Sequence, residues 1–314
     1  MKYLKYNYII LLAIIMASCA PYKNIPQLNS FNDLKYRADV SKIMLNNGIE
    51  LAYTDEGQGE TILFIHGLGS YIPAYDKIIP ELSKNYRCIA VDLPGYGKSS
   101  KDPHSGMMTF YADVIHEFAK EMNLGMFTIA GHSMGGQISM VYSIKWPEEI
   151  KNMVLFAPAG FERFTAGQKE WFVDIMTPVL VKNTTYEGIE TNLAFNFFKM
   201  PKDAKFMITD RMAMRGASDF ENYCYVVSNS VAGMVSEPVI DKLDEIKAPT
   251  LIFFGENDYL IPNRYLNPGK TKDIADYGQQ HIPNSELVMI PKCGHFLMFE
   301  KPDIVIEKIN AFVK

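Results

Sequence analysis

A serine held between glycines is the residue of this sequence with the clearest potential for chemistry. Ser133 lies in the run Gly131-His132-Ser133-Met134-Gly135-Gly136, which matches the pattern G-x-S-x-G. An apolar run at residues 127–130 precedes it, and an amphipathic segment at 138–145 follows it. Strand, motif and helix in this order predict a sharp turn that exposes a nucleophilic serine. The helix that begins there would direct its positive end at a developing negative charge.

Short, continuous apolar runs indicate the elements that would position this serine. They alternate with longer segments whose apolar residues recur every three or four positions. Continuous runs predict strands buried on both faces, and helical segments between them predict parallel β–α–β crossovers. The turn sequence Asn46-Asn47-Gly48 predicts an opening hairpin and so an antiparallel start. We therefore expect an α/β protein with a doubly wound, mostly parallel sheet, whose strands are 61–65, 87–91, 127–130, 153–156, 250–254 and 287–290.

One connection is far longer than a crossover helix needs. The segment between the expected strands 153–156 and 250–254 must carry structure of its own. It is rich in phenylalanine and methionine, and we expect a helical insertion over residues 161–237. Its apolar side chains are explained most simply as its own core, with the lining of a substrate pocket as a second role for a few.

With these elements the sequence resembles the α/β-hydrolase family from about Ile43 to the C-terminus. The Ser133 motif corresponds to the nucleophile elbow of that family. His66-Gly67-Leu68-Gly69 directly follows the expected strand 61–65 and matches the family's oxyanion loop, and residues 92–99 match a structural turn. The resemblance implies an α/β-hydrolase core of residues 43–160 and 238–314, capped by a helical lid over 161–237.

The resemblance also implies which acid and base would activate Ser133. The family's acid follows the strand at 250–254, where Asp258 lies, with Glu256 as an alternative. The family's base follows the last strand, where His295 lies. The order Ser133, Asp258, His295 is the one that this fold uses.

Each group of such a triad has a defined role. His295 would accept the proton of Ser133 and later return it to the leaving group. Asp258 would hold the imidazole tautomer and stabilise its protonated form. The backbone N–H groups of Leu68 and Met134 would donate to the oxyanion of the tetrahedral intermediate. The resemblance thus implies a serine esterase that cleaves a small to medium carboxylic ester through an acyl-enzyme, without a cofactor.

Other histidines and arginines have simpler explanations. His66 and His132 fit as structural members of their motifs, and the remaining histidines form no cluster typical of a metal site. Arg163, Arg211 and Arg215 could meet a carboxylate of the substrate, although a solvated helix face is the simpler explanation.

The first residues predict export and a lipid anchor. Two lysines precede an apolar run at residues 8–17, which is about half the ~20 residues of a membrane-spanning helix and is typical of a signal peptide. Met16-Ala17-Ser18-Cys19 resembles the lipobox of bacterial lipoproteins, in which the cysteine is lipidated and becomes N-terminal after cleavage. We expect a signal peptide over 1–18, lipidation of Cys19 and a tether over 19–42. The protein would then be held on a membrane of the cell envelope, facing the periplasm or at the outer membrane. An uncleaved anchor, or an ordinary signal peptide with a coincidental cysteine, is the alternative.

Composition excludes several classes of function. The 314 residues are 48% hydrophobic and 21% charged, which is ordinary for a globular protein. A net charge of −5 leaves no basic surface of the kind that binds nucleic acids. Four cysteines, none in a C-x-x-C pair, are too few for a disulfide framework or a structural zinc site.

The sequence leaves several functions open. An amidase, a C–C hydrolase and a haloperoxidase-like enzyme would keep the same triad and fold. A lipoprotein without catalysis, which binds an apolar ligand under the lid, is a competitor from another class. Neither the identity of the substrate nor the oligomeric state is indicated.

Overall fold

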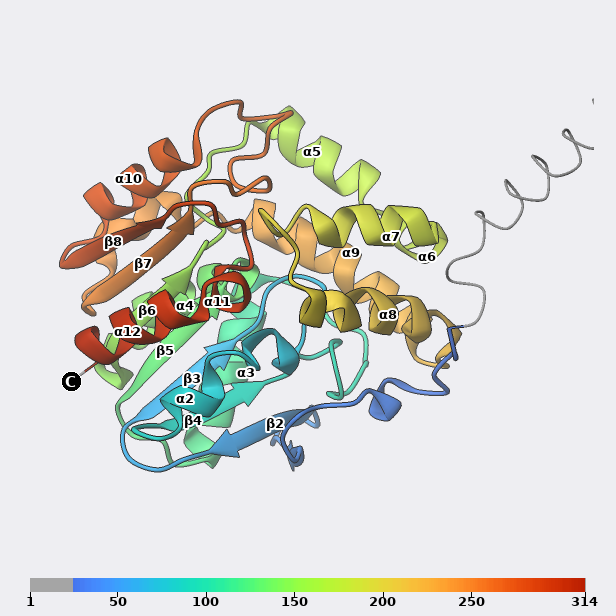
Figure 1. Ribbon diagram of the computed structural model, residues 1–314, viewed down its shortest axis with the longest axis horizontal. Coiled ribbons are helices and arrows are strands. Elements are labelled where there is room, and N and C mark those ends of the chain that lie inside the picture. The colour runs from blue at the N-terminus through green and yellow to red at the C-terminus, as the bar shows by residue number, and fades with distance from the viewer. Residues whose placement is uncertain (1–24, 314) are drawn as a thin grey trace, which may run out of the picture.

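The computed structural model describes residues 25–313, which form an eight-stranded sheet with helices on both of its faces (Figure 1). The strand order is β1-β2-β4-β3-β5-β6-β7-β8. β1 and β2 form the expected hairpin, β2 is antiparallel to β4, and all other neighbours are parallel. The predicted fold class is therefore confirmed. The strands are β1 (Ser41–Met44), β2 (Glu50–Glu56), β3 (Thr61–Ile65), β4 (Arg87–Val91), β5 (Phe127–His132), β6 (Ile150–Phe156), β7 (Thr250–Gly255) and β8 (Ser285–Ile290).

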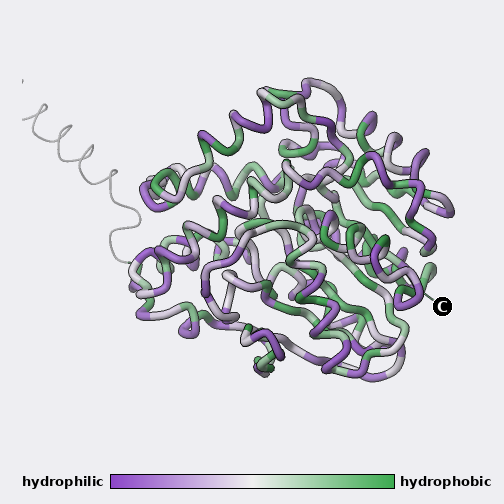
Figure 2. The backbone as a smooth tube through the Cα atoms, turned by 180° about the vertical axis from the view of Figure 1, so that it is seen from behind, coloured by the Kyte–Doolittle hydropathy of each residue, from purple (hydrophilic) through white to green (hydrophobic). Residues whose placement is uncertain are grey.

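The apolar runs become strands because helices cover them on both faces. Every residue of β3, β5 and β7 is buried. Helix α4 (Met134–Lys145) packs on β5 and β6, α10 (Thr271–His281) packs on β7 and β8, and α3 (Met108–Glu121) packs on α4. The short helix α2 (Ile79–Leu82) contacts α12 (Pro302–Phe312). Figure 2 shows the result, with hydrophobic stretches concentrated in the strands and hydrophilic ones on the outer helices and loops.

Five helices fill the long connection between β6 and β7. They are α5 (Ala166–Ile175), α6 (Pro178–Asn183), α7 (Tyr186–Ala194), α8 (Lys205–Ala213) and α9 (Phe220–Ser236). Thr165, Thr177 and Thr185 cap the first three, since each threonine side chain accepts a backbone N–H of the first helical turn. All five helices fall within residues 161–237, where the sequence analysis places the cap, and we use that name for them.

The segment before β1 differs from the tether expected over residues 19–42. From Ile25 onward the chain packs against the folded protein, and Phe31 and Leu34 are 1% and 2% exposed. The N–H of Leu28 donates to the C=O of Ala213 on α8. A few well-spaced apolar side chains are enough to hold a polar stretch, and composition alone does not reveal this. We call residues 25–34 the N-terminal strap.

The predicted signal peptide, residues 1–18, and Cys19 lie outside the described residues. Within residues 25–313, no helix has both the length and the apolar character needed to cross a membrane.

Candidate active site

Ser133 lies in the tight turn between β5 and α4. Its φ of 53° and ψ of −117° place it in a backbone region that residues other than glycine rarely adopt. Its carbonyl oxygen accepts N–H groups of Gly136, Gln137 and Ala159, and its own N–H donates to Phe156. These four hydrogen bonds hold the strained conformation that presents the side chain, as a nucleophile elbow requires.

Two glycines are needed in this turn because three backbone segments approach closely. A Cβ on Gly135 would lie 2.1 Å from the carbonyl oxygen of Ile65, at the end of β3. A Cβ on Gly131 would lie 2.3 Å from the carbonyl oxygen of Gly135. The G-x-S-x-G pattern therefore reflects how closely α4 is packed against β3 and β5.

Asp258 and His295 form a buried hydrogen-bonded pair beyond the carboxyl ends of β7 and β8. Nδ1 of His295 lies 2.7 Å from Oδ2 of Asp258, and the two side chains are 3% and 0% exposed. Because a carboxylate only accepts, Nδ1 is the donor in this contact, and Nε2 of the neutral tautomer is an acceptor. Glu256, the alternative acid, is exposed.

Ser133 and His295 line the same cavity. Within the described part of the chain, no hydrogen bond joins the Ser133 hydroxyl to the imidazole. Such bonds are often long in enzymes without substrate and tighten when substrate binds.

The oxyanion loop follows β3, and a buried histidine holds it. His66 donates from Nδ1 to the carbonyl oxygen of Gly67 at 2.8 Å, and its Nε2 accepts the N–H of Leu93 at 3.0 Å. Burial lowers the pKa of His66, which keeps the ring neutral in this tautomer. The N–H groups of Leu68 and Met134 have no protein acceptor among residues 25–313, which leaves both available to an oxyanion.

The turn at residues 92–99 organises the backbone beside this loop. The carboxylate of Asp92 is completely buried and accepts the N–H of Ile72 at 2.8 Å, the N–H of Lys98 at 2.7 Å and the hydroxyl of Tyr36 at 2.6 Å. With every contact made to the protein itself, Asp92 has a structural role.

His132 connects the elbow to His295. It is 1% exposed, its Nε2 lies 3.1 Å from the carbonyl oxygen of His295, and the two ring centroids are 4.7 Å apart. Burial lowers the pKa of His132 well below its usual value, so the ring is neutral and Nε2 donates to that carbonyl. His132 therefore helps to position the backbone and ring of His295.

Comparison with known proteins agrees with this geometry. Residues 60–302 match the family model described as the α/β hydrolase fold. The chain belongs to the α/β-hydrolase family. Lipase 1 of Psychrobacter immobilis is 26% identical, over 96% of this chain and 94% of the relative. The 2-hydroxy-6-oxo-6-(2'-aminophenyl)hexa-2,4-dienoic acid hydrolase of Metapseudomonas resinovorans is also 26% identical, over 85% and 88%.

Solved structures support the same fold. A probable hydrolytic enzyme from Pseudomonas aeruginosa PAO1 has a TM-score of 0.83 at 22% identity, over 92% of this chain and 99% of that one. An esterase from Exiguobacterium antarcticum has a TM-score of 0.74 at 22% identity, over 87% and 98%. The family and these relatives make the protein an enzyme of the hydrolase class.

In this α/β hydrolase, two cavities meet at Ser133. One has a volume of about 450 Å³ and the other about 390 Å³, and Leu68, Ser133 and His295 line both. The cap supplies most of the apolar wall, including Met176 and Met234 in both cavities. Ser133 can therefore reach a substrate that extends into two separate spaces.

Two arginines give the larger cavity positive charge. Arg211 and Arg215 line it, and no aspartate or glutamate does. Arg211 donates to the carbonyl oxygen of Gly69, and Arg215 donates to that of Thr184 at 2.6 Å. Neither forms an ion pair within residues 25–313. A solvated helix face is thus the wrong explanation for these two arginines, whereas Arg163 is exposed and pairs with Asp241 at 2.5 Å.

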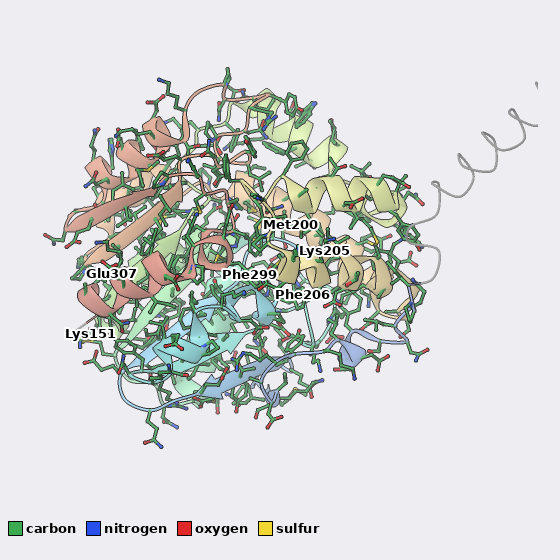
Figure 3. All side chains as sticks on the ribbon, viewed as in Figure 1. Lys151, Met200, Lys205, Phe206, Phe299 and Glu307 are labelled. Carbon is green, nitrogen blue, oxygen red and sulfur yellow. The ribbon has the colours of Figure 1, made fainter. Side chains whose placement is uncertain are left out.

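A single carboxylate joins the cap of the hydrolase to the loop that carries His295. Glu300 accepts the N–H groups of Gly294, Phe198 and Lys199 at 2.9, 3.1 and 2.8 Å. Beside it, Phe206 of α8 lies against Phe299 of the short helix α11 (Leu297–Glu300), with ring centroids 6.0 Å apart (Figure 3). Sequence reasoning missed this connection, because a glutamate next to a helix start carries no signal of a distant partner.

No group of three or more His, Cys, Asp or Glu side chains within residues 25–313 is placed to hold a metal ion.

Proposed function

We propose that this hydrolase cleaves a small to medium carboxylic ester through an acyl-enzyme. Ser133 is the nucleophile, His295 the general base and Asp258 the residue that orients the base. The buried 2.7 Å contact between Asp258 and His295, in the cavity that Ser133 lines, is the observation that carries the proposal.

The proposed reaction has two halves. Nε2 of His295 takes the proton of the Ser133 hydroxyl as its oxygen attacks the ester carbonyl, and Asp258 stabilises the imidazolium. The N–H groups of Leu68 and Met134 stabilise the oxyanion. The imidazolium then protonates the leaving alcohol, which leaves an acyl group on Ser133. Water, deprotonated by the same imidazole, releases the acid by the reverse sequence.

The names of the relatives and the size of the cavities support an ester of limited size. Several relatives are named lipase or esterase. Cavities of about 450 and 390 Å³ suit one small molecule, and their apolar walls favour substrates whose CH₂ groups become buried at ~0.8 kcal/mol each. We also propose that the enzyme is exported and anchored to a membrane of the cell envelope by a lipid on Cys19.

A chain-length series of aryl esters tests the proposed substrate class. We expect kcat/KM to rise over the first few methylenes and then to level off, and soluble esters to outperform emulsified triglycerides. Ser133→Ala should abolish turnover without unfolding, because the hydroxyl contributes little packing. A steady increase through long chains, with activation at an oil–water interface, would show a true lipase instead.

A C–C hydrolase is the second candidate, and the two arginines favour it. The relative from Metapseudomonas resinovorans is named for a dienoic acid, and Arg211 and Arg215 could meet a carboxylate in the larger cavity. Turnover of a 2-hydroxy-6-oxo-dienoate that exceeds turnover of every neutral ester, and falls in Arg211→Gln, would select this function.

A further inference from the structure

The large apolar side chains that are exposed gather on the cap and on the loop beside it. Five of them lie on α5 and α6: Trp171, Val173, Ile175, Val179 and Leu180, with Val179 66% exposed. The other exposed members are Phe195, Phe198 and Tyr225 elsewhere on the cap, Tyr259, Leu260 and Tyr265 in the loop after β7, and Met44, Met126 and Ile304 on the rest of the core. We call the five residues of α5 and α6 the cap face.

Helices α5 and α6 bury none of their residues. Both lie at the edge of the molecule, away from the sheet (Figure 1). Apolar side chains concentrated on helices without a covering layer mark an interaction surface, because a soluble protein otherwise spreads such side chains singly.

The N-terminal strap reaches the cap beside α6. Ile25 packs against Ile189, Ile208 and Met212 of α7 and α8. Gln27 lies against Gly216, next to Arg215.

Arg215 in turn donates to the carbonyl oxygen of Thr184, the residue that ends α6. The described chain therefore begins close to the helix that carries Val179 and Leu180.

The linker between Cys19 and Ile25 is short. An extended residue spans about 3.3–3.6 Å, so this stretch covers at most about 20 Å. A lipid on Cys19, as proposed above, would hold the start of the strap within that distance of the bilayer. In Figure 1, α6 and the start of the strap lie on the same side of the molecule, and α5 lies farther from the strap.

Two exposed leucines line the cavities. Leu180 lines the larger cavity and is 46% exposed, and Leu260 lines both cavities and is 36% exposed. The walls around Ser133 therefore continue into the exposed apolar side chains of the cap and of the neighbouring loop.

We propose that the cap face docks on the lipid bilayer, which places the openings of the cavities at the membrane interface. The inference rests on the proposed anchor at Cys19, which would keep the strap near the bilayer. The substrates of the enzyme would be esters that dissolve in the bilayer interface and are small enough for the cavities. Exposed apolar side chains would enter the headgroup region, and the lipid anchor would hold the protein at the surface.

The two tryptophans of the chain allow a direct test. Trp171 lies on the cap face, whereas Trp146 follows α4 at the amino end of β6, the opposite end of the sheet from the cap, and stacks on His116 with ring centroids 3.9 Å apart. Trp146→Phe and Trp171→Phe each leave one reporter. The protein that begins at Cys19 is coupled through that thiol to a maleimide phospholipid in phosphatidylcholine vesicles, since Cys88, Cys224 and Cys293 are buried.

Vesicles with brominated acyl chains should quench the fluorescence of Trp171 at least about twofold and leave that of Trp146 unchanged. Val173→Asp and Val179→Asp, which line neither cavity, should reduce the quenching without altering hydrolysis of a soluble ester in the absence of vesicles. Equal quenching of both tryptophans, quenching of neither, or self-association of the protein through the cap face would overturn the proposal. Chemical coupling to the phospholipid takes the place of the proposed lipid, so this result does not depend on whether cells lipidate Cys19.

Discussion

Asp258 accepts three hydrogen bonds, one from His295 and two from the backbone turn behind it. Its Oδ1 receives the N–H groups of Leu260 and Ile261 at 2.8 and 3.1 Å, which leaves Oδ2 fixed toward the imidazole. An amide here could donate to Nδ1 and so favour the wrong tautomer. We expect Asp258→Asn to fold normally and to lower kcat by as much as ~10⁴, measured on a short aryl ester. Glu256→Gln, the matched control on an exposed side chain, should be close to wild type, and the reverse pattern would assign the acid to Glu256.

His66 predicts a dependence of stability on pH. Burial lowers its pKa in the folded protein, so the unfolded chain binds the proton more tightly. This contribution to stability is present above the unfolded pKa of about 6.5 and is lost as the pH falls below it, by up to ~1.4 kcal/mol per pH unit. Protonation of Nε2 of His66 would also place its N–H against the N–H of Leu93, so that this hydrogen bond would be lost.

Urea unfolding at pH 7.5, 6.5 and 5.5 measures this effect. His66→Asn should be less stable than wild type at pH 7.5 and should lose less stability on acidification. Parallel losses in the two proteins would show that the histidine is not held neutral.

At the scale of elements, the elbow depends on the close approach of α4 to β3. Gly135→Ala would place a Cβ 2.1 Å from a backbone oxygen that cannot move away easily, so we expect a loss of more than ~2 kcal/mol in the free energy of unfolding. Gly167→Ala is the matched control, because no atom lies within 4 Å of its Cβ position and alanine favours a helix by ~0.5–1 kcal/mol. Urea denaturation compares them, and equal stabilities would contradict the tight packing.

The elements near the site differ in how far the sequence predicts them. Ser133, Asp258 and His295 each follow a strand with a clear apolar run, and the resemblance to the α/β-hydrolase family selects them among the residues of those turns. The strap could not be predicted, because Phe31 and Leu34 are isolated in polar sequence and their partners lie far along the chain. The orientation of Arg211 likewise depends on how the cap helices pack on the core, and nothing local encodes that.

At the level of the whole molecule, the sheet, the cap and the strap have different roles. The sheet carries the proposed chemistry, and the cap forms most of the cavity walls. The strap packs against the cap, and the proposed lipid on Cys19 would determine where the enzyme works. We therefore predict that loss of the anchor changes the location of the enzyme and leaves its catalysis intact.

Replacement of Cys19 tests that separation. We expect Cys19→Ala to lose the lipid and to become soluble or to remain unprocessed, while hydrolysis of a soluble ester persists. Stable anchoring needs more than one acyl chain, so mass spectrometry of the wild-type N-terminal peptide should show several. Equal retention on membranes by a fully cleaved Cys19→Ala protein would refute lipidation as the anchor.

Covalent labelling with a fluorophosphonate shows whether Ser133 is an activated nucleophile. The intact mass of the wild-type protein should increase by one adduct, and peptide mapping should place the adduct on Ser133. Ser133→Ala should remain unlabelled, and Asp258→Asn should label much more slowly. If the folded wild-type protein formed no adduct, or if an adduct on another residue persisted in Ser133→Ala, Ser133 would not be the activated nucleophile.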